Sequence, residues 1–175
     1  VVGGWTTGPQ PCTSTSSWFS VRLTRKSAAW ALSKGEAFRT IAALELYGFL
    51  MGIMLFVAPH KSANYEGRVR FGLYTDNQSN GYLLDKLQTI KMPLAAILME
   101  VGWELRVRNV SAPLEWIHRD QNSEADALTN ECFEGFDHQR RIQVDPATME
   151  FAILRKVLEA ERVLAAKLGS VKVLK

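Results

Sequence analysis

The sequence predicts an α/β fold in which a mixed sheet is flanked by helices. Three observations support this prediction. Alternating apolar and polar residues near the N-terminus are typical of paired strands. Residues 41–58 are almost entirely apolar, which is typical of a buried helix. Short strand-like segments then alternate with helical ones, and this order favours helices packed on a sheet that contains parallel strands.

The first two predicted elements form an antiparallel pair. Residues 1–6 are apolar and strand-like, and residues 8–17 form a turn-rich loop. In residues 18–24, Phe19, Val21 and Leu23 occupy alternate positions and should line the inner face of a second strand.

The next predicted element is a helix that begins at the capping box of residues 33–36 and ends near Val57, before Pro59. Its apolar residues lie nearly all round, so it should be covered on more than one side. Only Glu45 is charged between residues 41 and 58. A membrane span needs about 20 apolar residues, so we favour a buried helix and expect no membrane partner.

The remaining elements follow from capping residues and apolar periodicity. Residues 68–75 should form a strand with Val69, Phe71, Leu73 and Thr75 on one side, followed by Asp76. Further along, the sequence predicts a helix to about Thr89, a helix at 94–105, a strand at 114–117, a helix capped by Asn122, an extended segment at 141–144 and a long helix at 146–168 ended by Gly169. We expect one domain over residues 1–145 and a helical extension over 146–175.

Composition limits the class of protein only loosely. Hydrophobic residues make up 47% and charged residues 22%, which is an ordinary globular balance. The net charge of +3 is compatible with a polyanionic partner and equally with a solvated surface. Cys12 and Cys132 lack metal-ligand spacing, so we expect free thiols and an intracellular location, in the cytoplasm or nucleus. No signal peptide precedes the first strand-like segment.

Three acidic residues are candidates for a catalytic or metal-binding role, and the position of each also has a purely structural explanation. Glu45 interrupts an apolar helix, where a carboxylate is costly unless it is paired, binds a cation or faces a less buried stripe. Asp76 ends a strand, a favoured place for ligand sites, but it is also a good helix N-cap. Asp126 lies near the start of a helix, where the dipole favours an acid.

Together the three acids form an ordered set. Converging carboxylates can hold two Mg²⁺ ions roughly 4 Å apart for in-line phosphoryl displacement. Hard oxygen ligands suit Mg²⁺ or Mn²⁺ rather than Zn²⁺. The sequence offers no His/Cys cluster as an alternative metal site.

Three motifs contain these acids: IAALELY at 41–47, YTDNQSN at 74–80 and WIHRDQNSEADAL at 116–128. They resemble the three downstream motifs of ribonuclease H-like domains in the reverse transcriptases of retroelements such as retrotransposons. The resemblance covers about residues 1–145, and the last motif is its most specific part.

The resemblance implies a nuclease that cuts the RNA strand of an RNA–DNA hybrid, with an adjacent reverse transcriptase domain as a second partner. Glu45, Asp76 and Asp126 would hold Mg²⁺ or Mn²⁺, and Glu45 would also orient water. RNA would be distinguished through its 2′-hydroxyls. Candidate contacts for the substrate are Asn77, Gln78, Asn80 and Asn122, for which turn formation and capping are alternatives.

The sequence departs from the family pattern in one major respect. The family has its first acid on the first, central strand, whereas no Asp precedes Asp76 and residues 1–5 resemble the second strand. The first strand and its Asp would then lie upstream of Val1 in a truncated chain, or this copy is degenerate. The alternative function is therefore an inactive module that binds nucleic acid or packs against a polymerase. His118 stands where many relatives have Pro, so we assign it no role.

Two surfaces are candidates for contacts with partners. Basic residues that could line a nucleic-acid groove, or simply face solvent, are Arg22, Arg25, Lys26, Lys86 and Lys91. The apolar residues of the last helix could dock a neighbouring domain or pack on their own domain; they are Phe151, Leu154, Leu158 and Val163. We expect most of the five tryptophans to lie in the core.

Overall fold

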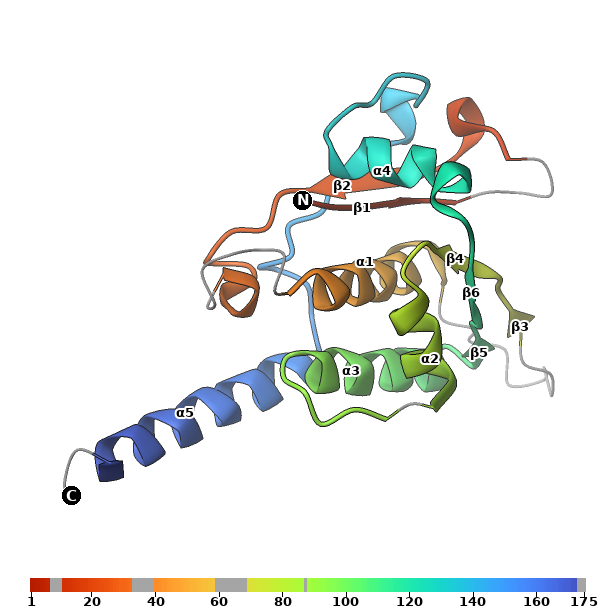
Figure 1. Cartoon of the computed structure of the whole chain (residues 1–175). Coiled ribbons are helices and arrows are strands. Elements are labelled where there is room, and N and C mark those ends of the chain that lie inside the picture. Colours follow the sequence, from red (N-terminus) through yellow and green to blue (C-terminus); the bar gives the residue numbers. More distant parts are fainter. Residues whose placement is uncertain (7–10, 33–39, 59–68, 87, 173–175) are drawn as a thin grey trace.

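The structure is a computed structural model that describes residues 1–6, 11–32, 40–58, 69–86 and 88–172 (Figure 1). The described part contains helices and short strands in mixed order, as the predicted α/β class requires. The strands are β1 (Val2–Trp5), β2 (Trp18–Val21), β3 (Val69–Arg70), β4 (Leu73–Thr75), β5 (Val110–Ser111) and β6 (Leu114–Trp116). The helices are α1 (Ile41–Phe56), α2 (Gln78–Lys86), α3 (Leu94–Val107), α4 (Ser123–Thr129) and α5 (Leu154–Lys172). Short 3₁₀ segments occur at Thr13–Thr15, Ala29–Leu32, Arg119–Gln121 and His138–Arg140.

The strands pair two by two. β1 and β2 are antiparallel, with Val2 opposite Val21 and Trp5 opposite Trp18, which confirms the predicted N-terminal pair. β3 pairs with β5 and β4 pairs with β6, both in parallel. The sequence predicts one mixed sheet, whereas the described residues form three separate pairs. The predicted strand over residues 68–75 is also divided, although residues 69, 71, 73 and 75 are partly buried and residues 70, 72 and 74 between them are exposed, as the predicted alternation requires.

The elements around α1 form layers (Figure 1). The β1–β2 pair lies on one side of α1 and α3 lies on the other, and both contact it. This arrangement explains why α1 is apolar nearly all round: Leu46, Leu50, Met51 and Ile53 are fully buried. Its predicted start at residues 33–36 and its predicted stop at Pro59 lie outside the described residues. No helix among those described is both long and apolar enough to cross a bilayer.

The strand β2 is covered on both faces. Phe19 packs in the main core with α1, while Trp18 packs in a second cluster with Leu128 and Phe136. Phe19 thus faces the main core as predicted, and the opposite face of β2 is buried as well because α4 covers it. Trp18 also has the Arg141 guanidinium 5.1 Å from its ring centre. The other tryptophans are less buried, and Trp103 and Trp116 are exposed.

The last helix begins eight residues later than predicted. α5 begins at Leu154 rather than Pro146, and it continues through Gly169 to Lys172. A side chain from another helix fixes its start: the buried carboxylate of Glu100 in α3 accepts hydrogen bonds from the backbone N–H groups of Ala152, Ile153 and Leu154, at 2.8, 2.7 and 2.6 Å. This carboxylate supplies the acceptors that the first turn of a helix lacks.

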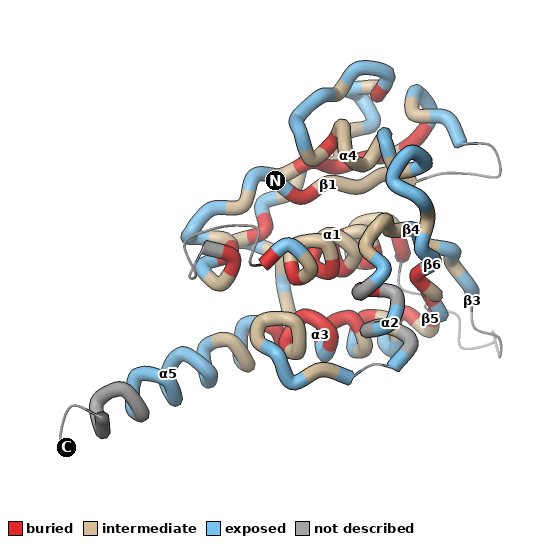
Figure 2. Tube along the Cα trace, in the orientation of Figure 1, coloured by how far each residue is buried: buried red, intermediate tan, exposed pale blue. Residues whose placement is uncertain are grey.

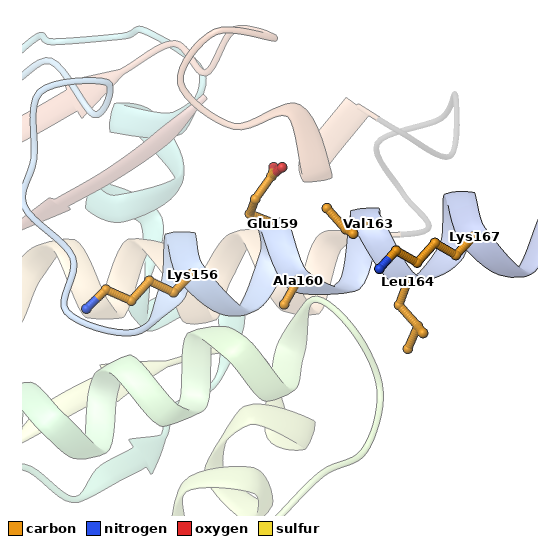
Figure 3. Close-up of a pocket in the computed structure, with 6 residues that line it drawn as sticks. All are labelled: Lys156, Glu159, Ala160, Val163, Leu164 and Lys167. Atoms are coloured by element: carbon orange, nitrogen blue, oxygen red, sulfur yellow. The ribbon is translucent and has the colours of Figure 1, made fainter.

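The two halves of α5 have different surroundings. Leu154 and Leu158 pack in the main core together with Phe151, which precedes the helix, whereas Val163 is exposed on a stretch that extends away from the body (Figures 1 and 2). A shallow hollow of about 530 Å³ follows this stretch and is lined by residues of α5 only, with Lys156 and Lys167 at its ends (Figure 3). A hollow built from one helix encloses no ligand, so it is not the candidate site.

Tyr47 gives a test of how tightly α1 is packed. Burial raises the pKa of its hydroxyl from 10.0 to about 12, although Arg155 lowers it. Above pH 10 the unfolded tyrosine ionises while the folded one keeps its proton, so this group destabilises the fold as the pH rises from 10 to about 12. We expect the free energy of unfolding of Tyr47→Phe to fall less over this pH range, by up to about 3 kcal/mol. Urea unfolding of both proteins across this pH range measures the effect, and a difference that does not change with pH would contradict it.

Candidate functional site

The three acids predicted from the motifs lie on three different elements. Glu45 is in the second turn of α1, Asp76 directly follows β4, and Asp126 lies in the first turn of α4. All three are partly buried. The charges of Asp76 and Asp126 both act on Glu45 and raise its pKa, so the structure brings the three acids into one electrostatic neighbourhood.

The end of β4 positions Asp76. Its carboxylate Oδ1 accepts a hydrogen bond from Asn122 Nδ2 at 3.1 Å, and its backbone carbonyl accepts one from the Trp116 indole at 3.0 Å. Asn122 stands at the N-cap position of α4, as predicted, but its side chain makes no capping hydrogen bond. The predicted N-cap position is therefore right, but the predicted capping hydrogen bond is absent because the Asn122 side chain bonds to Asp76 instead. α2 begins at Gln78, so Asn77 rather than Asp76 directly precedes that helix.

The helix α4 positions Asp126 by packing on the β1–β2 pair. Leu128 is fully buried in the cluster with Trp18, and its carbonyl accepts a hydrogen bond from Ser20 Oγ at 2.7 Å. These contacts fix the helix two residues from the carboxylate. On the outer side, Arg119 Nε lies 3.3 Å from Asp126 Oδ2 in an ion pair. We did not predict this contact; the Arg that precedes Asn-x-x-Ala-Asp in the third motif was its only sequence signal.

Glu45 is held by α2 and by burial. Its Oε2 accepts a hydrogen bond from Asn80 Nδ2 at 3.3 Å. Burial raises the pKa of the Glu45 carboxyl, a hydrogen bond from Asn77 lowers it, and the negative charges of Asp76 and Asp126 raise it further. Glu45 therefore keeps its proton to a higher pH than an exposed glutamate does.

The four polar residues predicted to contact a substrate have unequal access to one. Gln78 is exposed and Asn77 is partly exposed. Asn80 is 1% exposed and faces Glu45, and Asn122 holds Asp76. Gln78 can thus reach a bound molecule, whereas the side chains of Asn77 and Asn80 contact Glu45 and that of Asn122 contacts Asp76.

The three acids have the ligand chemistry that a hard divalent cation requires, but their side chains do not converge on one point. Carboxylate and amide oxygens are the ligands that Mg²⁺ and Mn²⁺ prefer. In the described part of the chain, however, no three His, Cys, Asp or Glu side chains are close enough together to hold an ion. Metal binding at these acids would need the carboxylates to move closer together.

The basic residues predicted to line a groove are exposed side chains from separate parts of the sequence. Arg22 forms an exposed ion pair with Glu131, beyond the C-terminal end of α4. Arg25, Lys26, Lys86 and Lys91 are exposed, and they belong to different segments. Within the described residues, Arg119 is the basic side chain that forms an ion pair with a candidate acid.

Gly3 tests the contact that places α4 and Asp126. A Cβ added at Gly3 would lie 2.8 Å from Leu128 Cβ and 3.3 Å from the backbone carbon of Leu128. Because neither atom can move without shifting α4, we expect Gly3→Ala to lower the free energy of unfolding by about 1–3 kcal/mol. Chemical denaturation measures this loss.

Gly102 provides the matched control. A Cβ added there meets nothing within 4 Å, and the residue lies inside α3. Alanine is the better helix former by about 1 kcal/mol, so Gly102→Ala should leave stability unchanged or raise it. Equal effects of the two substitutions would show that the contact between β1 and α4 is not tight.

Comparisons of this chain with protein-family models, with curated proteins and with solved structures found no match. A functional interpretation therefore depends on the residues and contacts described above.

Proposed function

We propose that this chain is a ribonuclease H-like domain of a retroelement reverse transcriptase, which hydrolyses the RNA strand of RNA–DNA hybrids. The observation that carries the proposal is the neighbourhood of Glu45, Asp76 and Asp126. These acids come from three motifs far apart in the sequence, yet the charges of Asp76 and Asp126 both act on Glu45. Proteins avoid placing like charges together in partly buried positions unless a cation or proton compensates them.

The residues around the acids have separable roles in this proposal. Asn122 orients the Asp76 carboxylate through the 3.1 Å hydrogen bond, and Leu128 anchors the helix that carries Asp126. Glu45 lies beside these acids and is the carboxyl group that would orient a water molecule. When bound by these acids, Mg²⁺ would activate water and neutralise charge on the phosphate.

Recognition of RNA falls to the residues that a substrate can reach. Gln78 is exposed and Asn77 partly so, at the start of the helix that follows Asp76. The Gln78 side chain can donate to and accept from a ribose 2′-hydroxyl, which distinguishes RNA from DNA, whereas the Asn77 side chain also hydrogen-bonds Glu45. In this proposal Asn80 and Asn122 act on the substrate only through the acids that they contact.

Cleavage of an RNA–DNA hybrid with labelled RNA, in the presence of Mg²⁺, tests the proposal. We expect Asp76→Asn and Asp126→Asn each to lower the rate at least a hundred-fold, since an amide cannot replace a charged metal ligand. Gln139→Glu is the control, because Gln139 is exposed in the segment His138–Arg140, outside the three motifs that contain the acids. Cleavage that survives both Asp substitutions would overturn the assignment of these acids.

A second candidate function is a module that binds nucleic acid without cutting it. Two observations favour it: Arg119 neutralises Asp126, and no three metal-ligating side chains converge in the described residues. An inactive module would bind a fluorescent hybrid equally well in Mg²⁺ and in EDTA and would leave the RNA intact. Fluorescence anisotropy combined with gel analysis of the RNA separates the two functions.

A further inference from the structure

Asn80 has an unusual position for a polar side chain. The residue is 1% exposed, and it lies in the first turn of α2, facing α1. Its Nδ2 donates to Glu45 Oε2 at 3.3 Å. Its Oδ1 is buried and accepts no hydrogen bond from the described residues. A buried amide oxygen without a donor is unfavourable, so the amide has a reason to turn this oxygen toward a ligand.

The amide and the carboxylate together resemble half of a cation site. Rotation of a carboxamide by 180° exchanges its oxygen and nitrogen without changing its shape. The amide oxygen would then lie at the position from which Nδ2 now reaches Glu45 Oε2, 3.3 Å away. Two oxygens bound to one Mg²⁺ or Mn²⁺ at adjacent octahedral positions are about 3 Å apart. The observed separation is therefore close to that of a shared cation.

The charges around this pair favour a cation over an anion or a neutral ligand. Asp76 and Asp126 act on Glu45 from two further elements. Among the described residues, the cationic side chain that forms an ion pair with one of the three acids is the exposed Arg119, which contacts Asp126. An amide oxygen adds a ligand without adding more negative charge to this neighbourhood.

We propose that Asn80 and Glu45 form a two-oxygen subsite for a hard divalent cation, with Asn80 Oδ1 as a ligand. The inference rests on the proposed function, because it takes Glu45 to be a metal ligand. It adds an uncharged ligand from α2 to the acids that the motifs predict. Asn80 thereby has a role in binding the cation and none in direct contact with RNA.

Calorimetric titration of the protein with Mn²⁺ tests this subsite. We expect Asn80→Ala to weaken Mn²⁺ binding about ten-fold or more, as loss of a ligand or its support does. Asn80→Asp should bind Mn²⁺ at least as tightly as the original protein, because it keeps an oxygen at this position. It should also lower the Tm in EDTA, where a second carboxylate lies against Glu45, and Mn²⁺ should restore that Tm. Gln139→Ala, an exposed change away from α2, should match the original protein in both measurements.

Each outcome decides the proposal. Unchanged Mn²⁺ affinity in Asn80→Ala would overturn it, as would a Tm deficit of Asn80→Asp that persists in Mn²⁺. If Asn80→Ala does not fold, the titration and Tm of Asn80→Asp decide alone. Absence of Mn²⁺ binding by the original protein would also overturn it. Hybrid cleavage is measured separately, so Mn²⁺ binding that depends on Asn80 in a protein without cleavage would refute the proposed function and leave the subsite standing.

Discussion

Replacement of Glu100 by alanine is expected to destabilise the protein by about 3 kcal/mol or more. Its fully buried carboxylate accepts three backbone hydrogen bonds at the start of α5, and no water can replace it there without opening the core. Alanine would leave three N–H groups without their acceptor, and each such group costs about 1–3 kcal/mol when buried. Thermal and urea unfolding measure the loss.

Two comparisons separate this cap from a general effect of losing a glutamate. Glu100→Gln keeps the shape and one acceptor oxygen, so it should lose less stability than Glu100→Ala. Glu161→Ala removes an exposed glutamate from α5 and should change the free energy of unfolding by less than about 0.5 kcal/mol. A Glu100→Ala protein as stable as Glu161→Ala would show that Glu100 does not anchor α5.

Replacement of Arg108 by alanine is expected to cost about 3 kcal/mol. Arg108 Nε donates to Glu104 Oε2 at 2.8 Å, and Nη1 donates to the Val57 carbonyl at the end of α1. Both side chains of the ion pair are only 11% exposed. Removing the guanidinium would leave a buried carboxylate and a buried carbonyl without these partners. It would also remove the hydrogen bond that joins the C-terminal end of α3 to that of α1.

An exposed ion pair of the same kind is the control for Arg108. Arg162 and Glu159 lie three residues apart on α5, with side chains 77% and 57% exposed. Exposed pairs contribute at most about 1 kcal/mol, so Arg162→Ala should have a small effect. The double variant Glu104→Gln, Arg108→Ala should recover part of the loss, because it removes the unpaired charge. Similar losses for Arg108→Ala and Arg162→Ala would contradict the role given to the buried pair.

Patterns of neighbouring residues in the sequence predict several helices and strands correctly. Pro93 and the apolar residues after it predict a helix at 94–105, and α3 covers Leu94–Val107. The alternation of residues 18–24 predicts a strand, and β2 follows it as far as Val21. β5 escapes prediction because two residues are too few to show a pattern.

Contacts between residues far apart in the sequence explain where the predictions differ from the structure. The start of α5 depends on Glu100, more than fifty positions away, so the capping preference of nearby Pro146 misplaces it. Asn122 has the right place for an N-cap, but its side chain is oriented so that Nδ2 donates to the charged Asp76 carboxylate, and its oxygen does not cap α4. The burial of Asn80 against Glu45 depends on how α2 packs on α1, which the polar motif at 74–80 does not reveal.

The central claim is that Glu45, Asp76 and Asp126 share one cation-dependent site. Paramagnetic broadening of backbone amide signals by Mn²⁺ tests it most directly, because the ion broadens only signals from residues near it. We predict that signals from residues around 45, 76–80 and 126 broaden together, and that Asp76→Asn and Asp126→Asn each reduce this broadening. Broadening confined to other parts of the chain, or none at all, would contradict it.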